Sequence, residues 1–325
     1  MGRQKEQTIN KRNDKTSLPL RKQHNIKQGK FYANRYIHIM VWITLIYFLI
    51  FRYWPLVWIS IAFKDFKILK GYFDSDWVGF YNFKHIFKNM PYFWKLIRNT
   101  FALNGLSILF AFPAPIIFAI LLNEIRLSYF KRTVQTVSYL PHFLSTVVVV
   151  GIVRTFLSPS LGALNKLIAD LGAEKINFLQ IPAYFWGLMV IVGIWQSVGW
   201  SAIIYLSAIL SIDPSLYEAA EIDGAGRWKK IYHVTLPGIR STIIILLILR
   251  IGSMMSVDTE KIYLFQNNVN LGVSEMFPTL TYKIGLVNNE PSRAAAYGLF
   301  SSIISLIFVL GANKVSKKYS EISII

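Results

Sequence analysis

Six long apolar stretches constrain this chain more than any other feature. The hydrocarbon core of a bilayer is about 30 Å thick, and a helix needs about 20 mostly apolar residues to cross it. Stretches of that length recur along the sequence. We therefore expect an all-α integral membrane protein with six transmembrane helices in one membrane domain. The expected spans are roughly 37–62, 99–122, 134–157, 184–210, 239–257 and 294–313.

Two of the expected spans carry irregularities. The second contains Pro113 and Pro115, which should kink it because proline cannot donate a backbone hydrogen bond. The fifth is interrupted by Arg250. The composition agrees with a membrane location, since 54% of the 325 residues are hydrophobic and only 16% are charged.

The formal net charge of +18 could suggest binding to nucleic acid, but the basic residues collect in tails and loops between the apolar stretches. The first 36 residues alone hold ten Lys or Arg. With the N-terminus inside, the cytoplasmic segments hold more positive charge than the outer ones. We therefore expect a basic cytoplasmic tail at 1–36, the membrane domain at 37–313 and a cytoplasmic C-terminal tail at 314–325. The bilayer, not nucleic acid, is the expected partner.

Catalytic and metal-binding chemistry finds no support in the sequence. The chain has no cysteine, and its five histidines lack the spacing of metal ligands. It also lacks the G-x-x-x-x-G-K-[ST] phosphate loop, so it should neither bind nor hydrolyse ATP. We expect a chain that is not an enzyme and binds no cofactor or metal.

The segment 211–238, between the fourth and fifth spans, is expected to form a cytoplasmic helix–turn–helix. Asp213 can cap a helix whose first turn contains Pro214, and Gly224 permits the left-handed backbone that ends it. A second short helix should run until Pro237. Such a segment could be gripped by another protein, or could be only a solvated surface.

The motif within this segment resembles the EAA motif of ABC importer permeases. It consists of Glu218-Ala219-Ala220, Gly224, Val234 and Leu236-Pro237, with valine at one position where isoleucine is usual. Further segments resemble the carbohydrate-uptake branch of that family, and within it the LplB-like and alginate-oligosaccharide permeases. These segments are Phe63-Lys64-Asp65-Phe66, Val78-Gly79-Phe80-Tyr81-Asn82-Phe83, Phe112-Pro113-Ala114-Pro115, Leu140-Pro141-His142-Phe143, Gly199-Trp200, Asp213-Pro214-Ser215-Leu216-Tyr217 and Asp223-Gly224-Ala225.

The resemblance implies a type I ABC importer permease fold in the bacterial cytoplasmic (inner) membrane, moving an oligosaccharide such as a uronate oligosaccharide. It implies a second homologous permease, as a heterodimer, two ATP-binding subunits that use ATP and Mg, and an extracytoplasmic solute-binding protein. The residues expected to couple to the ATPase are Glu218, Ala219, Ala220, Asp223, Gly224, Leu236 and Pro237.

Polar residues within spans are costly and usually face a cavity, so they are the candidates for a substrate pathway. They fall on single helical faces, where packing between helices is the competing interpretation. Arg250 needs a partner, which could be a carboxylate, a carbonyl or an anionic substrate. The candidates are Asn104 in the second span, Gly193, Gln196, Ser197 and Trp200 in the fourth, and Arg250, Met254 and Val257 in the fifth.

Three alternatives compete with a sugar importer. An ion-coupled secondary transporter should carry acidic residues within its spans, and these spans carry essentially none. A membrane-embedded enzyme should show clustered carboxylates or metal ligands at one membrane face. The same ATP-driven machinery could also carry a peptide or an amino acid, which the motif at 218–237 permits.

Overall fold

The structure is a computed structural model, and it describes residues 35–88, 90–255 and 258–320. The chain divides into two compact units, residues 1–60 and 61–325. Four continuous helices within the described residues are long and apolar enough to cross a membrane. Two further pairs of helices are sharply bent, and each pair meets the same requirement if its two helices are counted as one span. The number of candidate spans is then six.

The first candidate span is one helix that changes its winding along its length. It begins as α2 (Arg35–Phe48), passes through the π-helical turn η1 (Leu49–Tyr53) and ends as the 3₁₀ helix η2 (Trp54–Phe63). The predicted span 37–62 is confirmed in its bounds. The last residues of η2 belong to the second unit.

A short antiparallel ladder opens the second unit. Its strands are β1 (Lys64–Asp65) and β2 (Asp76–Trp77). They are the only strands among the described residues, and each is two residues long. Helix α3 (Tyr81–Lys88) follows.

The second span is longer than predicted. It consists of α4 (Met90–Leu106), the π-helical turn η3 (Ser107–Ala111) and α5 (Pro113–Glu124), and it begins at Met90 instead of near residue 99. The added residues include Lys95 and Arg98, whose charges had placed them outside the apolar stretch.

The third span is broken, contrary to the prediction of one helix over 134–157. Helix α6 (Ser128–Tyr139) and the 3₁₀ turn η4 (Leu140–Phe143) meet α7 (Thr146–Phe156) at a bend of 105°. Ser145 caps the new helix by accepting a hydrogen bond from the backbone N–H of Val148. Beyond α7 the chain forms α8 (Ala163–Asp170) and the 3₁₀ turns η5 (Phe178–Gln180) and η6 (Pro182–Tyr184).

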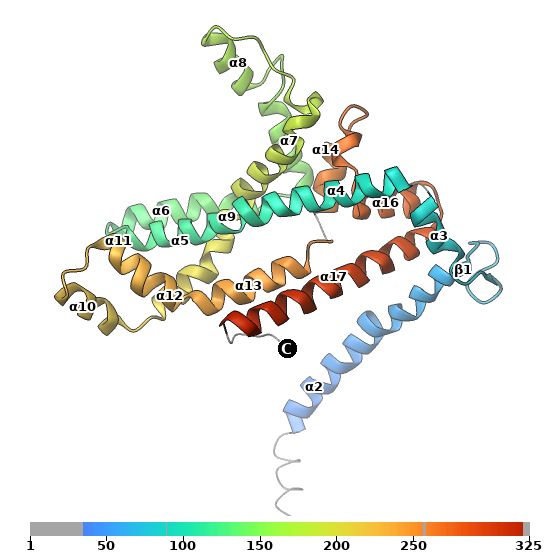
Figure 1. The fold of residues 1–325 in the computed structure, drawn as a ribbon, viewed down its shortest axis with the longest axis horizontal. Coiled ribbons are helices and arrows are strands. Elements are labelled where there is room, and N and C mark those ends of the chain that lie inside the picture. The colour runs from blue at the N-terminus through green and yellow to red at the C-terminus, as the bar shows by residue number, and fades with distance from the viewer. Residues whose placement is uncertain (1–34, 89, 256–257, 321–325) are drawn as a thin grey trace, which may run out of the picture. The chain divides into compact units, whose positions relative to one another are not determined.

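The fourth span, α9 (Phe185–Leu210), matches the predicted range 184–210 and packs against α5 and α6 (Figure 1). Gly199 allows the close contact with α6. A Cβ at this position would lie 2.3 Å from the carbonyl oxygen of Ser138, so a larger residue would push the two helices apart.

The segment after α9 forms α10 (Pro214–Ile222), α11 (Arg227–Lys230), the π-helical turn η7 (Ile231–Thr235) and α12 (Leu236–Gly238). Helix α13 (Arg240–Gly252) then follows at a bend of 60°. The prediction of a fifth span running to residue 257 is wrong, because α13 ends at Gly252 and residues 253–255 form a turn. Arg250 therefore lies in the last helical turn and not in the middle of a span.

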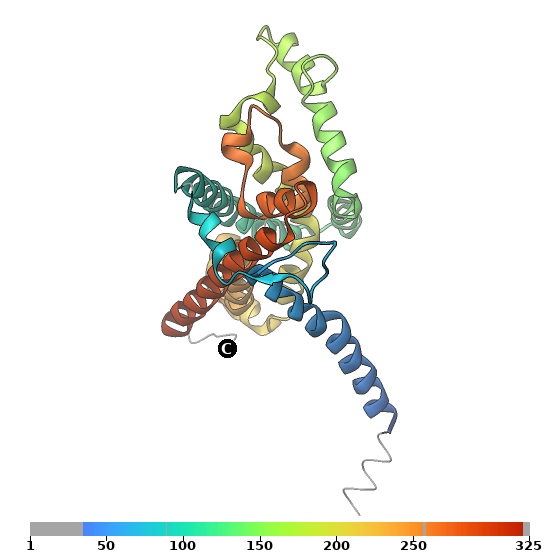
Figure 2. The same cartoon turned by 90° about the vertical axis from the view of Figure 1, so that its right-hand side faces the viewer.

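The expected outer loop at 258–293 is largely helical. It contains α14 (Thr259–Phe265), α15 (Leu271–Ser274), α16 (Phe277–Tyr282) and the π-helical turn η8 (Lys283–Val287). The sixth span, α17 (Pro291–Ser320), extends past the predicted end at residue 313 into the expected tail. Within the second unit, α10 and α11 lie at one end of the bundle and β1 and α3 at the opposite end (Figures 1 and 2).

Three of the π-helical turns have a common cause. Each ends two residues before a proline, whose ring would collide with the carbonyl four residues earlier in an α-helix. That carbonyl belongs to the central residue of the π-helical turn in every case, so the wider winding relieves the collision. The pairs are Leu49–Tyr53 with Pro55, Ser107–Ala111 with Pro113, and Ile231–Thr235 with Pro237. The expected kink at Pro113 therefore takes the form of a π-helical turn.

Candidate functional site

The segment 211–238 has the local structure that its sequence predicts. The carboxylate of Asp213 accepts a hydrogen bond of 2.9 Å from the backbone N–H of Ser215, and this bond lowers the pKa of Asp213. Gly224 has a φ of +73°, the left-handed conformation that a residue with a side chain rarely adopts. The cap and the glycine fix the two ends of α10.

Contacts across the turn hold the two helical parts of this segment together. Lys230 Nζ lies 2.7 Å from Glu221 Oε2, and the hydrogen bond and charge of Lys230 lower the pKa of Glu221. The hydroxyl groups of Tyr217 and Thr235 are 3.0 Å apart. These contacts tie α10 to α11 and to η7.

The predicted coupling residues lie mostly on the outside of this segment. Large apolar side chains are exposed beside them, with Trp228 80% exposed and Tyr232 68% exposed. The exposed residues of the predicted set are Glu218, Ala219, Asp223, Gly224 and Pro237, while Ala220 and Leu236 are half-buried.

A cavity of about 860 Å³ lies within the second unit, between α4, α5, α9, α13 and the start of α14. Most of the predicted pathway residues line it: Asn104, Gly193, Gln196, Ser197, Trp200 and Arg250. Met254 is not among the lining residues, and Val257 lies outside the described residues. The predicted face of the fourth span therefore meets Asn104 of the second span and Arg250 at one cavity, while the rest of the predicted fifth-span face is not part of the lining found among the described residues.

Arg250 finds a partner that sequence reasoning did not name. Its Nη2 donates a hydrogen bond of 2.6 Å to the hydroxyl of Ser107 in η3. The carboxylate of Asp258 lies 2.6 Å from Lys261 Nζ. Ser107, Asp258 and Lys261 also line the cavity.

An aromatic stack occupies the wall where the third span breaks. The rings of His142 and Trp200 are parallel within 4°, with centroids 4.7 Å apart, and Phe143 meets Trp200 edge-on at 5.6 Å. His142 lines the cavity. Sequence reasoning noted Leu140-Pro141-His142-Phe143 only as a resemblance, because a break inside an apolar run leaves no periodic signal.

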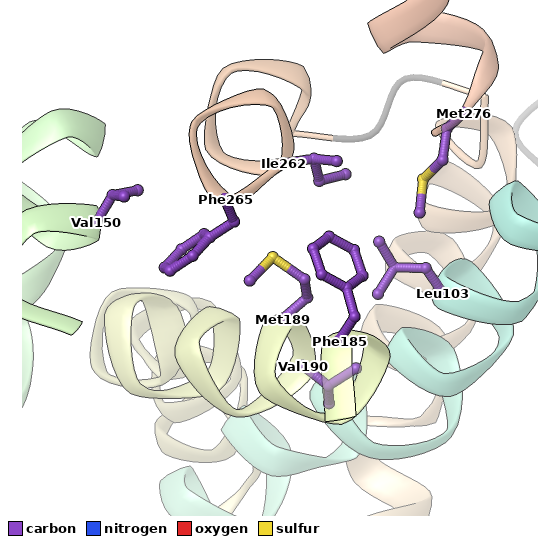
Figure 3. Packing of buried hydrophobic residues seen from close by; sticks show 8 residues of the cluster. All are labelled: Leu103, Val150, Phe185, Met189, Val190, Ile262, Phe265 and Met276. Atoms are coloured by element: carbon purple, nitrogen blue, oxygen red, sulfur yellow. The ribbon is translucent and has the colours of Figure 1, made fainter. Parts of the chain in front are cut away.

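A hydrophobic cluster closes one end of the cavity. Figure 3 shows Met189 and Phe185 of α9 facing Phe265 and Ile262 of α14. Met189 and Ile262 belong both to this cluster and to the cavity lining. The helical segment 259–265 is therefore part of the cavity wall and not a loop remote from it.

Side chains from three spans hold the segment 264–275 in place by binding its backbone carbonyls. Asn99 is fully buried and donates to the carbonyls of Gly272 and Glu275 at 3.1 and 2.9 Å. Trp186 donates to the carbonyl of Val273 at 2.9 Å. Arg154 of α7 donates to the carbonyl of Leu264.

An ion-pair cluster adds to this attachment. Glu275 lies 3.0 Å from Lys95 Nζ and 3.3 Å from Lys283 Nζ. Burial by itself would raise the pKa of Glu275, but the hydrogen bonds from Lys95 and Tyr92 and the charges of both lysines lower it below its ordinary value. Glu275 is therefore a carboxylate whose ionised form is stabilised by the fold.

Residues 111–321 match the family described as "Binding-protein-dependent transport system inner membrane component". Protein LplB of Bacillus subtilis (strain 168) is 44% identical over 288 residues, which cover 89% of this chain and 90% of that protein. The polygalacturonan/rhamnogalacturonan transport system permease protein YteP of the same organism is 43% identical and covers 90% of this chain and 91% of its own length.

Solved structures agree with these relatives. A chain of a bacterial ABC transporter involved in the import of the acidic polysaccharide alginate is 37% identical, with a TM-score of 0.82, and the match covers 90% of this chain and 99% of that one. The alginate transporter in complex with an alginate pentasaccharide-bound periplasmic protein matches equally well. The all-α permease fold is thereby confirmed, and the chain belongs to the inner membrane components of binding-protein-dependent transport systems.

Proposed function

We propose that this chain is the permease subunit of an ATP-driven importer that passes an oligosaccharide through the cavity between α4, α9 and α13. The observation that carries the proposal is the direct connection, along the chain, of the segment 211–238 to two helices that line the cavity. The segment 211–238 joins α9 directly to α13, and both helices contribute residues to the cavity lining. A displacement of this segment would therefore reach the cavity walls, which is what alternating access requires.

The lining of the cavity suits a sugar with negative charge. Gln196 and Ser197 offer hydrogen-bonding groups, and the aromatic ring of Trp200 suits the apolar face of a sugar ring. Among the lining residues Arg250 and Lys261 are cationic and Asp258 is anionic, so the charged side chains leave one positive charge in excess. We infer that a uronate-containing oligosaccharide is the preferred cargo, in line with the polygalacturonan/rhamnogalacturonan and alginate named for the relatives.

The exposed side of α10 and α11 is the surface that we assign to a separate ATP-binding subunit. Glu218, Ala219 and Gly224 lie exposed there, and the small side chain at 219 permits close approach by a groove of another protein. The bulky side chains of Trp228 and Tyr232 add apolar area that such a partner would cover. ATP and Mg would be bound by that partner and not by this chain.

The complete transporter would contain a second, homologous permease, two ATP-binding subunits and an extracytoplasmic solute-binding protein. A periplasmic protein accompanies the related alginate transporter, which supports the last of these. Both termini and the segment 211–238 would face the cytoplasm, following the excess of basic residues in the segments on that side of the bacterial cytoplasmic membrane.

Reconstitution would test the proposal. The chain, its partner permease, its ATPase and its binding protein are incorporated into liposomes, and ATP hydrolysis is measured with neutral oligosaccharides, uronate oligosaccharides and peptides. We expect stimulation by uronate oligosaccharides, weaker stimulation by neutral ones and none by peptides. Stimulation by a peptide alone would overturn the carbohydrate assignment, and equal stimulation by neutral sugars would overturn the preference for acidic cargo.

A further inference from the structure

A hairpin over residues 64–78 presents bulky apolar side chains that nothing in the second unit covers. Its base is the ladder between β1 and β2, in which Lys64 lies opposite Trp77. At its tip Leu69 is fully exposed, Phe73 is 89% exposed and Ile68 is 61% exposed. Apolar side chains this exposed imply that the hairpin meets an apolar surrounding.

The hairpin is well ordered internally, so the exposure of these side chains is built into its structure. The hydroxyl of Ser75 donates to the carbonyl of Gly71 at 2.5 Å and accepts from the backbone N–H of Lys67 at 3.3 Å. Lys64 Nζ donates to the carbonyl of Tyr72 at 2.7 Å. Internal polar groups are thus satisfied while the apolar side chains point outward.

Hydrogen bonds also fix the hairpin at the level where the spans begin and end. The amide of Asn82 donates to the carbonyls of Ala62 and Lys64, both at 2.9 Å. The backbone N–H of Phe66 donates to the hydroxyl of Ser292 at 2.9 Å, in the first turn of α17. Because η2 ends and α17 begins here, the hairpin sits where these helices leave the apolar layer of the membrane.

Helix α3 continues the same surface with a mixture of aromatic and basic side chains. Phe80 and Tyr81 are exposed at its start. Lys84 and Lys88 are exposed one helical turn apart, and neither forms an ion pair within the described residues. Aromatic rings and lysines together are typical of the headgroup region of a bilayer, where each presents an apolar body and a polar end.

We propose that the hairpin 64–78 and helix α3 form a membrane-interface platform, with the side chains of Ile68, Leu69 and Phe73 inserted among phospholipid headgroups and upper acyl chains. Protein–protein interfaces are depleted in lysine, whereas residues 64–88 contain five, at positions 64, 67, 70, 84 and 88. A lipid surface fits both kinds of side chain. The platform is independent of the cargo and of the direction of transport.

The absence of cysteine from the chain makes a direct test possible. Leu69→Cys and Phe73→Cys are labelled with the fluorophore NBD in the full transporter, assembled with cysteine-free partner subunits in liposomes. Glu174→Cys is the control, because Glu174 is exposed in a polar segment between α8 and η5. The liposomes carry phospholipids with a nitroxide on the headgroup or high on the acyl chain, and quenching is measured without and with the sugar-loaded binding protein.

We expect blue-shifted NBD emission at positions 69 and 73 and nitroxide quenching at least about threefold stronger than at position 174, unchanged by the binding protein. Emission typical of water at both positions, with iodide quenching equal to that at position 174, would overturn the platform. Loss of lipid quenching when the binding protein is added would also overturn it, and would assign the surface to protein docking. None of these measurements requires transport, so the result is separate from the proposed function.

Discussion

The guanidinium of Arg250 donates to the hydroxyl of Ser107 across 2.6 Å, which links the last turn of α13 to the π-helical turn η3. A neutral hydroxyl orients the guanidinium without cancelling its charge. The charge of Arg250 therefore stays available to the cavity that it lines. This differs from Lys261, whose charge is paired with Asp258 at 2.6 Å.

Replacing Arg250 should affect acidic cargo selectively. Hydrogen bonds to charged groups contribute about 1.5–3 kcal/mol, so Arg250→Met should lower the uptake rate of a uronate oligosaccharide by roughly 10- to 100-fold. Arg250→Lys keeps the charge and should lose less. Initial rates of ATP-driven uptake in proteoliposomes measure this. An equal loss for neutral oligosaccharides would mean that Arg250 is structural.

Ser107→Ala should have a smaller effect of the same kind. It leaves the charge of Arg250 in place and removes only the group that orients it, so only part of the about 1.5–3 kcal/mol that a hydrogen bond to a charged group contributes should be lost. We expect a decrease of about 2- to 10-fold in uronate uptake. The double variant Ser107→Ala, Arg250→Met should be no worse than Arg250→Met alone. Additive losses in the double variant would show that the two residues act independently.

The sequence predicted α9 well and the third and fifth spans poorly, for identifiable reasons. Helix α9 is continuous, carries no proline and is predominantly apolar, so hydropathy alone locates it. The break between Phe143 and Thr146 and the end of α13 at Gly252 both fall within stretches long and apolar enough to be predicted as single spans, where hydropathy does not register a change in backbone direction. Composition decides that a segment is in the membrane, but backbone geometry decides whether it is straight.

The difference between what composition and what backbone geometry determine also explains which cavity residues could be predicted from the sequence. Gln196, Ser197 and Trp200 recur at helical spacing, so periodicity places them on one face. His142 enters from the broken span, and Lys261 from a segment that looks like a loop in the sequence. Those positions depend on tertiary packing, for which a single sequence offers no periodic signal.

Gly199 should be essential for packing, because the carbonyl that a side chain would meet belongs to the backbone of α6 and cannot rotate away. Overpacking of this kind costs about 1–3 kcal/mol, so Gly199→Ala should lower the midpoint of thermal unfolding by several degrees. Gly187→Ala is the matched control on the same helix, since a Cβ there has no neighbour within 4 Å. Equal midpoints for the two variants would contradict the close contact between α6 and α9.

Glu275 should make stability depend on pH in a defined direction. Its pKa is lower in the folded protein than the ordinary value of 4.5. A depressed pKa stabilises the fold at pH values above the unfolded pKa, and this contribution disappears as the pH falls through the folded value. Glu275→Gln should thus reduce thermal stability at pH 7, and the difference from the wild type should shrink below about pH 4.5. A difference that stays constant between pH 3 and 7 would contradict the role of the ionised carboxylate.

Gly224 should be required for coupling and not for insertion into the membrane. Its φ of +73° is inaccessible to proline, which fixes φ near −65°. Gly224→Pro should therefore redirect the turn between α10 and α11, separate Glu221 from Lys230 and leave the spans intact. We expect normal amounts of assembled permease but loss of most uptake, while ATP hydrolysis no longer responds to the binding protein. Glu218→Lys, at an exposed position of α10, should give the same uncoupling by changing the surface and not the backbone.

The control for Gly224 lies two residues away. Gly226 has a φ of −70°, and a Cβ at this position has no neighbour within 4 Å, so Gly226→Ala should be tolerated. Uptake and binding-protein-stimulated ATP hydrolysis are measured side by side for the three variants in the reconstituted transporter. Normal uptake in both Gly224→Pro and Glu218→Lys would refute the assignment of this surface to the ATPase. Loss of uptake in Gly226→Ala as well would mean that the turn tolerates no substitution. The loss of uptake in Gly224→Pro would then not be explained by the left-handed backbone at Gly224.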